Sequence, residues 1–204
     1  SDLPKSMMVI PPELFYMESF GKDPFTQTEL SSIAKRVYIR WGDVNIELGD
    51  TVLIIGAGPI GIMHAFLAKI QGAVKVFMND LSEDRLALCK ELDPDIITVT
   101  PAELKEKIMA ETKGNGVDVC IIAAPSPEAQ SSAIELMNMN GRVLFFGGLP
   151  KDRENVQLNS NTIHYKQLAV HGSARASLIQ YRKSLALVEN GLIPMKKIIS
   201  SRFK

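Results

Sequence analysis

From about residue 50 onward, short apolar runs alternate with longer stretches in which apolar residues recur every three or four positions. The short runs are almost wholly apolar, which is typical of parallel strands buried on both faces. The longer stretches have the period of amphipathic helices. This alternation predicts βαβ units in an α/β, doubly wound sheet of six parallel strands, with helices on both faces. The predicted strands are 51–55, 74–79, 96–99, 117–124, 141–147 and 168–172, and the predicted helices are 59–71, 82–92, 101–112 and 126–138.

The segments around this repeat are less regular. The sequence MNMNG at 137–141 predicts a turn before the fifth strand. The pattern of 177–191 is helical, and 193–203 is compatible with one more strand. Near the N-terminus, 7–17 resembles a strand broken by prolines, and 26–41 has a helical pattern with a threonine cap.

The stretch DTVLIIGAGPIGIMHAFLAK, residues 50–69, has no charged residue between its ends. Its length would permit a membrane span, but its central glycines would leave a lipid-exposed turn with unpaired backbone groups. The better interpretation is a strand and a helix joined at Gly56, Gly58 and Gly61, which fit the pattern G-x-G-x-x-G.

The context of these glycines predicts a dinucleotide-binding turn, because a strand precedes them, a helix follows, and Asp80 closes the next strand. Gly56 allows the tight turn, Gly58 allows the backbone to approach a pyrophosphate, and Gly61 allows close packing of helix on strand. The helix N-terminus adds N–H groups and a favourable dipole. The expected fold is therefore a Rossmann fold.

Asp80 is expected to accept hydrogen bonds from the adenosine ribose hydroxyls and to repel a 2′-phosphate, which favours NAD over NADP. Ser82 is the natural cap of the helix that follows, which would free Asp80 for the ribose. Arg85 is compatible with a solvated helix charge or with a contact to the ribose or adenine.

Other glycine motifs fit less well. A P-loop needs Lys and Ser or Thr after its last glycine, where this chain has Ile62 and Met63. No tyrosine is followed four positions later by the lysine of a short-chain dehydrogenase pair. A methyltransferase, which also places an acid on a ribose, stays an alternative that explains fewer of the six strands.

The composition argues against several classes of function but does not indicate a particular one. Lys+Arg and Asp+Glu are both 23, so no charge surplus points to nucleic acid or a membrane surface. The N-terminus lacks the apolar run of a secretory signal. Cys89 and Cys120, the only cysteines, have no paired spacing and are interpreted as buried thiols in a reducing compartment, the cytoplasm.

The segments GDTVLIIGAGPIGIMHAFLAKIQGA, DLSEDRLALCKEL, GVDVCIIAAPSPEA and MNGRVLFFGG resemble the cofactor domain of zinc-type medium-chain dehydrogenases. NTIHYKQLAVHGS and VENGLIPMKKIISSRF resemble the polyol and threonine dehydrogenase branch. The resemblance covers roughly 48–203 and implies roles for several residues. It places Gly58, Pro59 and Ile60 at the pyrophosphate, Asp80 and Arg85 at the adenosine, Ala124 beside the adenine, and Gly147 near the nicotinamide.

The catalytic half of that family is mostly missing from the sequence. By the resemblance, residues 1–48 are a remnant of the connection to the catalytic domain, with one helix, and 49–204 form the NAD-binding domain. Glu29 lies near the family's zinc-ligand glutamate but is followed by Leu30 rather than proline. His64 is expected to pack in the core, and His164 and His171 have no companion cysteine at ligand spacing. No catalytic or metal residue is therefore predicted.

The sequence thus predicts the NAD(H)-binding domain of a zinc-dependent alcohol or polyol dehydrogenase, which in complete form would transfer hydride between a secondary alcohol and NAD. This chain alone is expected to lack the activity. The sixth strand would lie at a sheet edge, and the resemblance implies pairing of such edges in a homodimer or a higher homo-oligomer. A nucleotide sensor without a catalytic half and an S-adenosylmethionine-dependent methyltransferase are the alternatives.

Overall fold

The computed structural model describes residues 44–173 and 178–198. The chain divides into two compact units, Trp41–Ala174 and the combination of Ser1–Arg40 with Arg175–Lys204. The elements expected at 7–17 and 26–41, and Glu29 with them, lie outside the described residues. The domain boundary expected at 48/49 stays a prediction.

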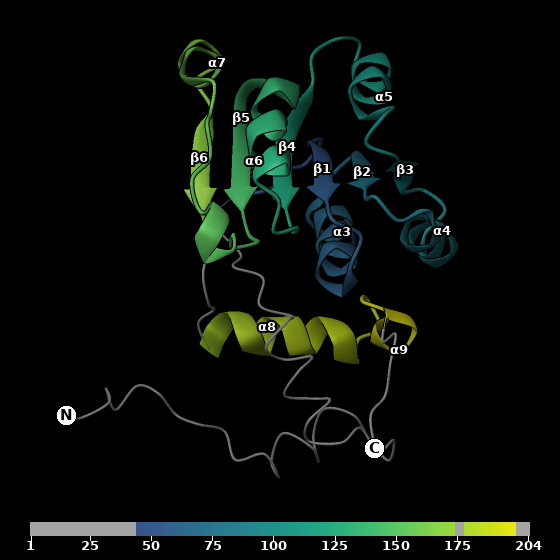
Figure 1. The fold of residues 1–204 in the computed structure, drawn as a ribbon. Coiled ribbons are helices and arrows are strands. Elements are labelled where there is room, and N and C mark those ends of the chain that lie inside the picture. The colour runs from purple at the N-terminus through teal and green to yellow at the C-terminus, as the bar shows by residue number, and fades with distance from the viewer. Residues whose placement is uncertain (1–43, 174–177, 199–204) are drawn as a thin grey trace, which may run out of the picture. The chain divides into compact units, whose positions relative to one another are not determined.

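The described residues of the first unit form one parallel sheet of six strands in the order β3-β2-β1-β4-β5-β6 (Figure 1). This order, with β1 and β4 at the centre, confirms the predicted doubly wound Rossmann fold. The two edges are β3 and β6, so the sixth strand lies at an edge as expected. The strands are β1 (Thr51–Ile55), β2 (Lys75–Asn79), β3 (Ile97–Val99), β4 (Val117–Ile122), β5 (Met137–Phe145) and β6 (Ala169–Gly172).

Local sequence signals fix the ends of the helix after β1. Pro59 stands at the first position of α3, where its missing N–H costs nothing, and Gly72 ends the helix in a left-handed conformation. The helices are α3 (Pro59–Gln71), α4 (Glu83–Leu92), α5 (Leu104–Glu111), α6 (Pro127–Ala133), α7 (Ser160–Tyr165), α8 (Leu178–Glu189) and α9 (Met195–Ile198), with 3-10 turns η1 (Ile134–Leu136) and η2 (Lys151–Arg153). None of the described helices is long and apolar enough to cross a bilayer.

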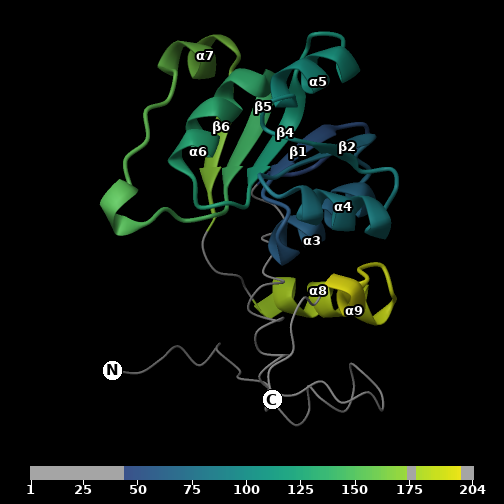
Figure 2. The ribbon, with the colours of Figure 1, turned by 45° about the vertical axis from the view of Figure 1, so that its right-hand side comes forward.

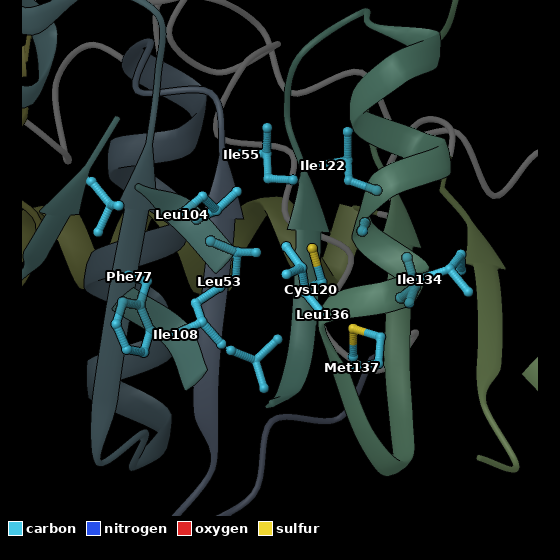
Figure 3. Close-up of a cluster of buried hydrophobic side chains, with 14 of the residues drawn as sticks. Leu53, Ile55, Phe77, Leu104, Ile108, Cys120, Ile122, Ile134, Leu136 and Met137 are labelled. Atoms are coloured by element: carbon cyan, nitrogen blue, oxygen red, sulfur yellow. The ribbon is translucent and has the colours of Figure 1, made fainter. Parts of the chain in front are cut away.

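Helices cover both faces of the sheet (Figure 2). On one face, α5 and η1 contribute Leu104, Ile108 and Ile134 to a buried cluster with the inward side chains of β1 and β4 (Figure 3). The α3 helix lies on the other face, since a Cβ at Gly61 would meet the Ile54 side chain at 3.5 Å. Alternate residues of β1 are thus buried on opposite faces, as the continuous apolar run predicted.

The segment 137–141 is not the turn that the sequence suggested. β5 begins at Met137, and the helix expected to run to 138 ends as α6 and η1. Met137 pairs with Val117, and Arg142 pairs with Val119, so the intervening residues bulge out of the ladder. Asn140 takes a left-handed conformation there, with φ of +57°. The residues expected to form a turn before the strand therefore form an irregularity within the first part of β5.

Two further elements differ from expectation. The extra strand expected in 193–203 is wrong over its described part, because Met195–Ile198 is a helix, α9. Pro194 precedes it and accepts the N–H of Lys197, so the chain turns instead of extending. The sequence pattern also missed α7, which Asn159 caps by accepting the N–H of Thr162 at 3.1 Å.

Both cysteines are buried and free, as predicted. Burial, followed by the negative charge of Asp80, raises the pKa of the Cys89 thiol to about 11. Burial also raises the pKa of the Cys120 thiol. Since the thiolate is the reactive form of cysteine, neither side chain is a candidate nucleophile.

The predicted packing of His64 in the core is confirmed. The side chain extends from α3 and is 2% exposed, and its ring lies edge-on to that of Phe146 with centroids 4.6 Å apart. Its Nε2 atom is buried without a hydrogen-bond partner. Burial lowers the pKa of His64 from 6.5 to about 4, so the imidazole is neutral at pH 7.

This burial predicts a loss of stability in mild acid. The unfolded chain takes up a proton at His64 near pH 6.5, whereas the folded chain resists protonation until about pH 4. The free energy of unfolding should therefore fall as the pH drops between these values, by roughly 3 kcal/mol in total. Urea unfolding at pH 7, 5.5 and 4 would measure it.

In His64→Leu, the free energy of unfolding should no longer show this part of its pH dependence. The control variant His164→Gln, at an exposed histidine, should retain it. Equal pH slopes for His64→Leu and the unsubstituted chain would contradict the assignment.

Candidate functional site

The sequence-predicted site residues gather at the carboxyl ends of the central strands. The strand order reverses between β1 and β4, and loops from β1, β2, β4 and β5 meet at that edge of the sheet (Figure 1). In open α/β sheets, ligands bind in the crevice at such a reversal.

The glycine turn after β1 has the backbone that its sequence predicted. Gly56 has φ of +110°, a conformation that L side chains rarely adopt. A Cβ on Gly61 would lie 1.7 Å from the carbonyl oxygen of Gly56, so only glycine lets α3 start this close to β1. Both residues are buried, and their role is to shape the turn rather than to offer a surface.

Gly58 and the two residues after it form the partly exposed part of the turn. Gly58 is the N-cap of α3, with φ of −72° and no side-chain cap, and a Cβ there would meet nothing within 4 Å. The first turn of α3, which begins at Pro59 and Ile60, contains no acidic residue. Its unpaired N–H groups and positive dipole end therefore offer an open place for an anion.

Asp80 follows β2 and lies against this turn. Its Oδ2 accepts the N–H of Ala57 at 2.7 Å, and its Oδ1 accepts the N–H of Ser82 at 2.8 Å. Ser82 caps α4 as predicted, so Asp80 does not serve as the cap. Both carboxylate oxygens of Asp80 nevertheless already accept backbone N–H groups, which the sequence did not predict. The guanidinium of Arg85 is 3.6 Å from Oδ2, and its side chain is 61% exposed.

Ala124 and Gly147 follow β4 and β5 and are in direct contact. A Cβ on Gly147 would lie 2.8 Å from the carbonyl oxygen of Ala124, and one on Gly56 would lie 3.2 Å from the Ala124 nitrogen. The structure therefore brings the glycine turn, Ala124 and Gly147 into contact with one another. Gln130, which the sequence did not single out, is buried on α6 and donates to the Gly147 carbonyl at 3.2 Å.

No metal centre forms within 44–173 and 178–198, where no three His, Cys, Asp or Glu side chains are grouped to hold an ion. His64 packs in the core, His164 lies on α7 and His171 on β6. The described residues therefore do not fit a zinc ion.

Comparison with known proteins identifies the protein family to which the chain belongs. The profile of the family described as "Zinc-binding dehydrogenase" matches residues 59–190, which is more than half of the chain. The chain therefore belongs to the zinc-binding dehydrogenase family, in agreement with the resemblance seen in its sequence.

A sorbitol dehydrogenase of Bombyx mori is 36% identical over 163 residues, a match that covers 78% of this chain and 45% of the relative. The chain thus spans less than half the length of this curated relative.

Two solved structures are similar in fold and contain nicotinamide cofactors. A zinc-binding dehydrogenase from Sinorhizobium meliloti bound to NADP has a TM-score of 0.68 and 29% identity, over 77% of this chain and 46% of that one. A structure described as a short chain alcohol dehydrogenase from E. coli CFT073, in complex with NADH, has a TM-score of 0.68 and 27% identity, over 81% of this chain and 47% of that one.

Proposed function

We propose that this chain is the NAD(H)-binding domain of a zinc-dependent alcohol or polyol dehydrogenase. The observation that carries the proposal is the open helix N-terminus at Gly58, which lies at the reversal of the strand order and directly follows Ala57, whose N–H is bonded to Asp80. A nicotinamide dinucleotide supplies the hydride acceptor in this family.

The residues at the crevice suit each part of that ligand. Gly58, Pro59 and Ile60 would hold the pyrophosphate by backbone N–H groups and the helix dipole, since no acidic side chain opposes an anion there. Asp80 and Arg85 would bind the adenosine, Ala124 would flank the adenine, and Gly147 would approach the nicotinamide. Gly56 and Gly61 would act by shaping the turn.

The described residues supply no group to polarise an alcohol. In the complete protein we propose hydride transfer between a secondary alcohol and NAD, with the catalytic residues in the part of the family that this chain does not span. The sorbitol dehydrogenase relative favours a polyol as the substrate class. A homodimer through the β6 edge, a cytoplasmic location, and the absence of nucleic acid and membrane partners stay predictions.

Substitution of Gly58 tests cofactor binding without disturbing the fold. Gly58→Val fits the backbone, because φ of −72° is open to any residue and a Cβ there meets nothing within 4 Å. The side chain would fill the cradle, so NADH affinity should fall by about ten- to a hundredfold while thermal stability changes little. Calorimetry and thermal unfolding measure the two effects.

A matched control is Gly172→Val, at another open glycine, on β6. It should bind NADH as the unsubstituted chain does. S-adenosylmethionine is the comparison ligand. Its binding in place of NADH would refute the proposal, as would a Gly58→Val chain that binds NADH normally.

The carboxylate of Asp80 predicts a preference for NADH over NADPH of about tenfold or more, because it would repel a 2′-phosphate. The exposed Arg85 opposes this preference without reversing it, since its charge is shared with Asp80. Fluorescence titration of one protein sample with both cofactors measures the ratio, and Asp80→Ala should narrow it. Equal affinities in the unsubstituted chain would overturn the assignment.

Catalysis should be separable from binding. The described residues hold no cluster of side chains that could bind a metal. This chain should therefore bind NADH, but it should not reduce NAD to NADH with any of a panel of polyols, with or without added zinc. Absorbance at the NADH band follows the reaction. Zinc-dependent turnover would show that the chain completes a metal site, with Glu29 and His64 the first residues to substitute.

A further inference from the structure

The carboxylate of Asp80 joins the loops that follow β1 and β2. Its Oδ2 accepts the N–H of Ala57, a residue 23 positions earlier in the chain, at 2.7 Å. Its Oδ1 accepts the N–H of Ser82 at 2.8 Å. The Asp80 side chain is 8% exposed, so these bonds are well shielded from solvent. A shielded carboxylate that bonds two loops constrains the shape of both.

The neighbouring amide of the turn is held in the same way. The N–H of Gly56 donates to the carbonyl of Asn79 at 2.7 Å. Two consecutive amides of the glycine turn are therefore bonded to two consecutive residues at the end of β2. Ala57 is itself 1% exposed, and a buried backbone N–H that loses its acceptor costs free energy. The conformation of the turn thus depends on which side chain stands at position 80.

Asp80 retains bonding capacity after these contacts. An ionised carboxylate offers about four lone-pair directions on its two oxygens, and the two backbone N–H groups occupy one on each oxygen. Ribose hydroxyls could use the remaining directions without displacing the turn. The Asp80 side chain can therefore bond the phosphate-binding turn and a ribose at the same time.

We propose that Asp80 is a positioning residue for the phosphate-binding turn in addition to its contact with ribose. The effect on ligand binding rests on the proposed dinucleotide function, whereas the effect on the turn does not. The consequence is that recognition of the pyrophosphate and of the ribose is coupled through one carboxylate. Substitution of Asp80 then weakens the binding of a ligand that has no ribose hydroxyls to offer it.

The ligand test uses NADH and an NADH analogue whose adenosine is 2′,3′-dideoxyadenosine. Asp80→Ala should lower the affinity for the analogue by about tenfold, because the turn is no longer fixed. The control variant, Asp84→Ala, removes the same charge from an exposed position in the first turn of α4 and should leave the affinity unchanged. An analogue that binds Asp80→Ala and the unsubstituted chain equally well would show that Asp80 acts through ribose alone.

A second measurement needs no ligand. Amide hydrogen exchange at Ala57 should accelerate by about tenfold or more in Asp80→Ala, while the amides of Leu53 and Ile54 in β1 keep their protection and show that the sheet is intact. Unchanged exchange at Ala57 would overturn the positioning role whether or not NADH binds. Accelerated exchange in a protein that fails to bind NADH would support the positioning role and refute the proposed function.

Discussion

The candidate site depends on one close approach, that of the first turn of α3 to the end of β1. With 1.7 Å between a hypothetical Cβ at Gly61 and the Gly56 carbonyl oxygen, no side chain fits between them. This contact brings the helix N-terminus to the middle of the sheet edge, where the loops after β2 and β4 are within reach. If α3 stood one side chain further out, its dipole would no longer point at the place where the strand ends converge. The packing of two glycines thus determines where an anion can bind.

The electrostatics of the site follow from that geometry. The partly exposed end of α3 is positive and carries no acidic residue in its first turn. Among the described residues, the carboxylate bonded to the turn is that of Asp80. Arg85 moderates this negative charge from an exposed position on α4. The N-terminal end of α3 therefore has the electrostatics that favour an anion, whereas the Asp80 carboxylate favours hydrogen-bond donors. The separation of these two preferences distinguishes the site from a general anion-binding turn.

The sequence was informative where local chemistry decides the structure. Pro59 and Gly72 delimit α3, and the continuous apolar runs of β1 and β2 identify strands buried on both faces. It was less informative where tertiary contacts decide. The residues MNMNG favour a turn locally, yet pairing of Met137 with Val117 draws them into β5. Similarly, the apolar residues after Pro194 suit a strand but form the short helix α9.

In the candidate site too, the sequence predicts the features that have a local signature and misses those that depend on tertiary contacts. The glycine motif and Asp80 could be found from spacing, because each has a local signature. The bond between Asp80 and Ala57 could not, since it depends on the register that sets Ile55 beside Asn79. The contact of Ala124 with Gly147 likewise follows from the pairing of Ile122 with Phe145. Gln130 gave no signal, because a single glutamine on a helix is ordinarily a surface residue.

The burial of both native thiols has a practical consequence for spectroscopy. The chain contains two cysteines, and both are shielded and hard to ionise at neutral pH. A cysteine introduced by Leu81→Cys, at a side chain that is 90% exposed beside Asp80, would react selectively with a maleimide dye. The loop after β2 can therefore carry a single fluorescent reporter beside Asp80 without removal of the native cysteines.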